Sequence, residues 1–232
     1  MDGTKSYLVG RRKIAVIDPG PDVEDHVRAL ALRVSGAESV VIVLTHGHDD
    51  HAASALGLAR EIGAEVLAPI GIEGADRVLH DGDSIETDVG TLLAVHTPGH
   101  TVEHLCFHWP AEAALFAGDM VLGHGDTTWV AEYPGCVADY LASIDRLRGL
   151  DLSVIYPGHG PALTDPTEAL DRFAEHRRGR VRQVATAMAA NPDASVEELL
   201  GVVYGDTIPS SMRGAARQSL SALVDHVRET RP

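Results

Sequence analysis

The sequence contains few cysteines, few aromatic residues and few basic residues relative to acidic ones. Its two cysteines, Cys106 and Cys136, are not in CxxC spacing and are too few for a disulfide framework, so we expect reduced, partly buried thiols. Aromatic residues make up 4% of the 232 residues, and the core must therefore be built mainly from Val, Leu, Ile and Ala. With 19 Lys and Arg against 34 Asp and Glu, the net charge of −15 disfavours broad attraction to nucleic acid or to an anionic membrane.

Long apolar runs are also missing. No run approaches the length that crosses a membrane, and residues 1–6 lack the basic and apolar regions of a signal peptide. We therefore expect a soluble cytoplasmic protein without a membrane partner. The length suits one large domain, or a core domain with a small appendage.

The hydrophobic pattern predicts a mixed α/β chain that ends in helices. Strands are expected at 6–10, 13–18, 40–44, 65–68, 84–87, 91–96, 104–109, 113–117 and 153–156, and helices at 22–35, 52–62 and 137–148. After Thr164 the pattern is helical throughout, with helices at 167–190 and 210–228 and a short helix opened by the capping box Ser195-x-x-Glu198. We therefore place a boundary between residues 1–164 and 165–232.

One run of residues stands apart from this pattern. Thr45-His46-Gly47-His48-Asp49-Asp50-His51 directly follows the apolar strand 40–44. Imidazoles and carboxylates crowded this closely are costly to hold together unless a positive charge lies between them. The run therefore indicates a metal site, and its spacing suggests two ions.

Three later loops carry similar side chains, each immediately after a predicted strand. They contain His100 in Thr97-Pro98-Gly99-His100, Asp119 in Ala117-Gly118-Asp119, and His159 in Tyr156-Pro157-Gly158-His159. Loops at strand ends are held by a stiff sheet, so they can form a preorganised site.

These residues, in this order, resemble the five-motif signature of the metallo-β-lactamase superfamily, with Asp18 in Ile17-Asp18-Pro19-Gly20 as the first motif. The resemblance covers about residues 5 to 165. It implies an α/β fold, the αββα sandwich of that superfamily, here with a small helical C-terminal extension.

The resemblance also implies ligand roles. His46, His48 and His100 would hold one metal ion, Asp50, His51 and His159 the second, and Asp119 would bridge both. A bridging hydroxide would then attack a carbonyl or phosphoryl centre, with no Ser or Cys nucleophile. Imidazole and carboxylate ligands favour two zinc ions, and the same ligands accept manganese or iron.

The resemblance leaves two substrate classes open. An aspartate at position 119 disfavours β-lactamase activity, since true β-lactamases of this fold generally lack it or use a cysteine ligand. It points to hydrolases of thioesters, lactones or phosphodiesters. Among these we expect a small ester, thioester or lactone as the substrate, with Asp50 as a catalytic residue beside its ligand role. His124, on the loop after Asp119, would face the substrate or be an ordinary surface residue.

The alternative is an endoribonuclease that acts on single-stranded RNA. Phe173-x-x-His176-Arg177, the capping box at Ser195 and the closing helix resemble the winged-helix-like tail of the beta-lactamase-like protein 2 branch, in which some members cut RNA. Arg177, Arg178, Arg180 and Arg182 would then contact phosphates, although a solvated helix face is the simpler interpretation. A homodimer is expected from the habit of the family.

Overall fold

The computed structural model describes residues 3–205 and 209–230. Its first sheet has the strand order β1-β2-β3-β4-β5, with β1 (Tyr7–Val9), β2 (Lys13–Ile17), β3 (Ser39–Val43), β4 (Glu65–Pro69) and β5 (Arg77–Leu79). The second has the order β10-β9-β8-β7-β6, with β6 (Ser84–Thr87), β7 (Gly90–His96), β8 (Leu105–Trp109), β9 (Ala114–Gly118) and β10 (Val154–Pro157).

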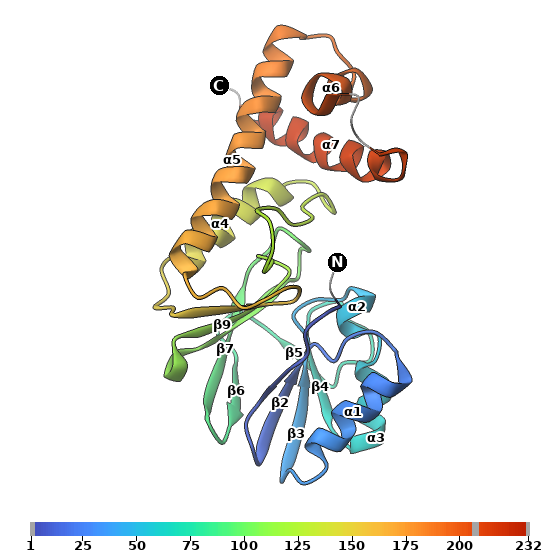
Figure 1. Cartoon of the computed structure of the whole chain (residues 1–232), viewed down its shortest axis with the longest axis vertical. Helices are drawn as coiled ribbons and strands as arrows, with labels where there is room; N and C mark the ends of the chain where they lie inside the picture. Colours follow the sequence, from blue (N-terminus) through green and yellow to red (C-terminus); the bar gives the residue numbers. More distant parts are fainter. Residues whose placement is uncertain (1–2, 206–208, 231–232) are drawn as a thin grey trace.

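The two sheets face each other, and helices cover both outer faces (Figure 1). α1 (Glu24–Val34), α2 (Asp49–Ala52) and α3 (Ala55–Ile62) belong to the side of the first sheet, and α4 (Cys136–Leu147) and α5 (Pro166–Ala190) to that of the second. Alternation along β2 explains the layers: Ala15 and Ile17 join the cluster between the sheets, whereas Ile14 and Val16 pack with α1 and α3. The predicted αββα sandwich is confirmed.

Most predicted elements are present within one to three residues of their expected bounds. The predicted helix 52–62 begins later, as α3 at Ala55, and Ala52 instead ends the separate helix α2. The two helices are divided at Ser54, whose backbone N–H and hydroxyl both donate to the carbonyl of Gly20. The three-residue strand β5 was not predicted, since so short a segment shows no clear period.

The C-terminal segment is helical, as predicted. It consists of α5, α6 (Val196–Tyr204) and α7 (Arg213–Thr230), with a short 3-10 turn at Ser210–Met212. The capping box of α6 is confirmed by reciprocal bonds between Ser195 and Glu198. Within the described ranges these residues form no strand, so a winged helix stays a prediction.

A single hydrophobic cluster joins this segment to the rest of the molecule. It contains Leu115 and Ile155 of the second sheet, Phe173 of α5, and Leu199 and Leu223 of α6 and α7. The boundary at 164/165 therefore stays a prediction, and the core continues across it. Within the described part of the chain, no helix combines the length and the apolarity needed to cross a bilayer.

Candidate metal centre

The predicted ligands come from loops that leave the sheets in the same direction. β2 and β3 run parallel, β7 and β9 are both antiparallel to β8, and β10 is parallel to β9. The carboxyl ends of β2, β3, β7, β9 and β10 carry Asp18, the Thr45–His51 run, His100, Asp119 and His159, respectively. The topology thus gathers residues from distant parts of the chain at one edge of the sandwich.

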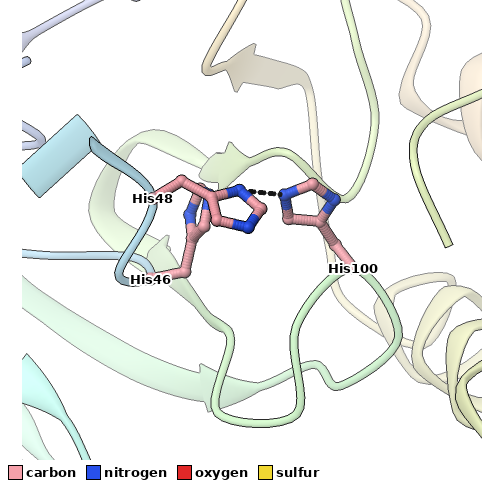
Figure 2. A group of neighbouring side chains, drawn as sticks. All are labelled: His46, His48 and His100. Atoms are coloured by element: carbon pink, nitrogen blue, oxygen red, sulfur yellow. Dashed lines mark hydrogen bonds between the residues drawn. The ribbon is translucent and has the colours of Figure 1, made fainter. Parts of the chain in front are cut away.

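His46, His48 and His100 form the first cluster. One ring nitrogen from each lies within 4.8 Å of the others. Figure 2 shows the rings converging, with Nδ1 of His48 3.0 Å from Nε2 of His100. His46 and His100 are buried, whereas His48 is partly exposed at the edge of the cluster.

Asp50, His51 and His159 form the second cluster, and Asp119 lies between the two. Nε2 of His159 is 3.1 Å from Oδ2 of Asp50. The Asp119 carboxylate lies 3.4 Å from Nε2 of His51, 3.8 Å from Nε2 of His100 and 3.6 Å from Nε2 of His159. Asp119 also groups with His46 and His51 as a third set of potential ligands.

In the first cluster, each of His48 and His100 has one ring nitrogen that points toward the other ring (the inner nitrogen) and one that points away (the outer nitrogen). Oxygen acceptors on the outer nitrogens fix where the ring protons lie. Nδ1–H of His100 donates to the carbonyl of Trp129 at 2.9 Å, and Nε2–H of His48 donates to the carboxylate of Glu132 at 2.6 Å. A neutral imidazole carries one proton, so the inner nitrogens of both rings present lone pairs to each other. A contact of 3.0 Å between two lone pairs requires an additional proton or a metal cation.

Asp18 and Thr45 orient the other two buried rings. The Thr45 hydroxyl donates to Oδ2 of Asp18 at 2.7 Å, so its oxygen accepts from Nδ1–H of His46 at 2.9 Å. Nδ1–H of His51 donates to the same Asp18 oxygen at 2.9 Å. Oxygen acceptors on the outer nitrogens of metal-binding histidines set the tautomer that leaves the inner nitrogen free for the ion.

The inner atoms fit a divalent cation. Nε2 of His46, Nε2 of His51 and Oδ1 of Asp119 are buried and have no hydrogen-bond partner among the described residues. Tetrahedral ligands at the usual Zn–N distance lie about 3.3 Å from one another. The 3.0–3.8 Å separations found here match that spacing.

Burial and mutual charge shift the pKa values of these groups in opposite directions. Burial, reinforced by the neighbouring histidines, holds the pKa of His46 well below its ordinary value, and burial also lowers the pKa of His100. Burial would lower the pKa of His51 as well, but Asp18 and Asp119 outweigh it and raise that pKa to about 10. Burial opposes ionisation of Asp119, yet His51 and its neighbours lower the pKa of that carboxyl to about 2.

These shifts predict that the metal-free protein is most stable near pH 6.5. A histidine with a lowered pKa, such as His46 or His100, contributes stability above the unfolded pKa of about 6.5, which is lost as the pH falls. His51 contributes stability below about pH 6.5, which is lost as the pH rises toward its folded pKa of about 10. Urea unfolding in EDTA from pH 5 to 8.5 measures both limbs and stays below the range in which Cys106, whose pKa is also raised by burial, makes stability fall with pH. His51→Asn should remove the limb between pH 6.5 and 8.5, and a wild-type free energy that stayed flat over that range would contradict the assignment.

Asp50 and His124 were the predicted catalytic residues. The Asp50 side chain is half exposed, faces His159 and accepts a bond from the hydroxyl of Thr4 at 3.2 Å. His124 is exposed beside the His159 loop, where the N–H of Gly123 donates to the carbonyl of His159 at 2.8 Å. Both catalytic roles stay predictions.

Sequence reasoning missed Glu132, which lies 84 positions from His48. No motif marks it, and only the folded loop brings it to the ring. His104 is fully buried, and its Nε2 accepts the backbone N–H of Asp119 at 3.3 Å, so it supports the metal centre from behind a ligand. Its place four residues after His100 was the available signal.

The model of the metallo-beta-lactamase superfamily matches residues 2–159. The chain belongs to this superfamily. The matched range contains every predicted ligand, from His46 in the first ligand loop to His159 in the last.

Relatives within the superfamily cover nearly the whole chain. A beta-lactamase-like protein 2 homolog of Caenorhabditis elegans is 31% identical over 236 residues, which cover 97% of this chain and 78% of the relative. An atrochrysone carboxyl ACP thioesterase of Aspergillus chevalieri is 32% identical over 227 residues, covering 91% and 71%. The crystal structure of a metallo-beta-lactamase family protein from Thermus thermophilus shares the fold, with a TM-score of 0.79 at 21% identity and coverage of 97% and 88%.

Proposed function

We propose that the chain is a metal-dependent hydrolase that cleaves thioesters of small acyl groups. A hydrolase is supported by the superfamily and by a relative named as a thioesterase. The observation that carries the proposal is a set of three buried atoms, Nε2 of His46, Nε2 of His51 and Oδ1 of Asp119, which have no hydrogen-bond partner among the described residues and belong to residues that group as potential ligands of one ion. Oriented rings of this kind are prepared for a cation rather than for one another.

The proposal assigns two divalent ions, with zinc as the first candidate and manganese or iron as alternatives. His46, His48 and His100 would hold one ion, and Asp50, His51 and His159 the other. The position of Asp119 between the clusters supports its role as the shared ligand. When bound, such ions supply Lewis acidity, which polarises a carbonyl and lowers the pKa of water.

The chain's own residues set the remaining chemistry. Both cysteines are buried, and burial raises the pKa of Cys106 to about 12, so neither thiol is available as a nucleophile. A departing thiol has an ordinary pKa of about 8.5 and leaves as a thiolate without a proton donor. The described residues at the ligand clusters are histidines and carboxylates that would bind the ions. A thiolate leaving group requires no further residue as a proton donor.

The ribonuclease alternative has weaker support. Arg177 is buried, which corrects both the phosphate-contact prediction and the solvated-face interpretation for this residue. Arg178 pairs with Asp145 at 3.0 Å, Arg182 pairs with Glu175, and Arg180 lies over the ring of Tyr204. The basic run thus serves contacts within the molecule. RNA binding, β-lactamase activity, a homodimer and a cytoplasmic location all stay predictions.

A substrate panel with measured metal content tests the proposal. The protein, loaded with zinc or manganese, is assayed on S-lactoylglutathione, an acyl thioester of N-acetylcysteamine, a lactone, nitrocefin and single-stranded RNA. We expect about two ions per chain and thioester cleavage that EDTA abolishes and added zinc restores. Cleavage of RNA alone, lost in the Asp119→Asn variant, would overturn the thioester assignment. A protein that binds no divalent ion would overturn the hydrolase proposal as a whole.

A further inference from the structure

A buried arginine of the C-terminal segment contacts the loop that carries part of the metal centre. Arg177 lies midway along α5 and is only 3% exposed, whereas Arg178, the next residue, is on the surface. Its guanidinium lies 5.3 Å from the centroid of the Tyr140 ring of α4. The guanidinium is therefore enclosed between two helices on the outer face of the second sheet.

The charge of Arg177 is not neutralised by a carboxylate. Among the described residues, no acidic oxygen lies within 4.0 Å of its nitrogens, and its Nε has no hydrogen-bond partner. An uncompensated buried charge is less stable than an apolar side chain of similar size. Packing alone would therefore favour Met or Leu at this position. The guanidinium differs from these side chains in being able to donate hydrogen bonds.

What the guanidinium does is donate to the backbone of the β9–α4 loop, residues 119–135. Nη2 of Arg177 donates to the carbonyl of Thr128 at 2.9 Å. The hydroxyl of Thr128 donates to the carbonyl of Asp119 at 2.8 Å. The carbonyl of the next residue, Trp129, accepts Nδ1–H of His100 at 2.9 Å. The Arg177 guanidinium thus holds Thr128 and Trp129 in place. These two residues in turn contact the backbone of Asp119 and the ring of His100.

Neighbouring contacts show that the loop is fixed from the same side. His176, the residue before Arg177, lies 3.1 Å from the carboxylate of Asp126. The hydroxyl of Tyr140, the ring beneath the guanidinium, donates to the carbonyl of Met120 at 3.0 Å. α4 and α5 together therefore hold the loop at three points between Met120 and Thr128.

We propose that Arg177 is a positioning residue that couples the C-terminal helical segment to the first ligand cluster through Thr128 and Trp129. The inference rests on the proposed metal binding. It goes beyond that proposal by giving the C-terminal segment a role at the site: α5 keeps His100 in the orientation that presents Nε2 to the ion. The contacts of Thr128 and Trp129 lead to the ring of His100 and to the backbone of Asp119, so the affinity of the first cluster should depend on Arg177 more than that of the second.

The test compares Arg177→Met with two controls. Arg178→Gln removes a neighbouring charge from α5, and Val184→Ala creates a cavity at a fully buried position of the same helix. Zinc and cobalt affinities are measured by chelator competition, cobalt spectra report the ligand geometry, and urea unfolding of each metal-free protein reports stability. Removing the hydrogen-bond partner of a ligand typically weakens metal binding about 10–100-fold. Arg177→Met leaves the Trp129 carbonyl in place and only loosens it, so we expect a loss at the lower end of that range, about 10-fold, at one ion of the pair. Val184→Ala should lower stability without that loss, and Arg178→Gln should change neither.

A second readout works without metal. In the metal-free wild-type protein the Nδ1–H of His100 should give a slowly exchanging proton resonance, because Trp129 accepts it in a buried position. Arg177→Met should broaden or abolish this resonance, and Arg177→Lys, which keeps a donor, should partly restore it. Equal losses at both ions in proportion to lost stability, or the same affinity loss in Val184→Ala, would overturn the proposal. If the wild-type protein bound no ion, the proposed function would fail, and the His100 resonance would still decide the role of Arg177.

Discussion

Asp119→Asn is expected to lower thioester hydrolysis by about 10³-fold and to weaken the binding of both metal ions. The substitution keeps the shape of the side chain and removes one negative charge. That carboxylate lies within 3.8 Å of the inner nitrogens of His51, His100 and His159, at the boundary between the two clusters. An amide carries no negative charge to offset the positive charge of the two ions, and its NH₂ group would point a hydrogen-bond donor at a cation.

The matched comparison is Asp50→Asn. Asp50 lies within 3.7 Å of His159 and His51 but groups with the second cluster only, so its loss should weaken one ion and spare the other. Metal analysis after dialysis, together with calorimetric titration, separates the two patterns. Loss of a single ion in Asp119→Asn, with normal affinity for the remaining one, would contradict the shared-ligand assignment.

Asp18→Asn is expected to destabilise the metal-free protein by about 3 kcal/mol, since it removes one partner of a buried charged network. Asp18 is 2% exposed and has a φ of +49°, a conformation that asparagine adopts as readily as aspartate. The backbone is therefore preserved. However, Oδ2 of Asp18 accepts from both the Thr45 hydroxyl and Nδ1–H of His51, and an amide nitrogen at that position would face two donors.

The same variant should release the His51 ring from its fixed orientation and so reduce metal affinity. Asp88→Asn is a suitable control, because Asp88 is exposed and accepts three backbone N–H groups of residues 11–13 instead of contacting the site. Urea unfolding with and without EDTA measures the stability change, and chelator competition measures the affinity. If Asp18→Asn bound metal as tightly as Asp88→Asn, the orienting role of Asp18 would be wrong.

The ligand loops could be predicted because their chemistry is local. A run such as His46-Gly47-His48 is unusual in any surroundings, and its position after an apolar strand fixes which edge of the sheet it occupies. The parallel arrangement of β2 and β3 and the shared direction of β7, β9 and β10 then bring the loops together. The sequence pattern and the sheet topology therefore both locate the metal centre at the carboxyl ends of these strands.

The partners on the outer nitrogens could not be predicted in this way. The carbonyl of Trp129 is a backbone atom, and every residue has one, so no sequence signal marks it. Glu132 is one acidic residue among 34 acidic side chains in the chain. Arg177 belongs to a basic run whose members differ only in which face of α5 they occupy, and the packing of α5 on α4 selects that face. These contacts depend on tertiary distances that no local pattern encodes.

The unbroken hydrophobic cluster that links the second sheet to α6 and α7 limits how this protein can diverge. A recombination event that exchanged residues 165–232 for a foreign tail would expose the faces of α4 and of the sheet that Leu170 and Phe173 now cover. It would also remove the donor to Thr128. Changes in specificity are therefore expected to accumulate by point substitution and loop-length variation at the strand ends, while the tail is inherited together with the sandwich.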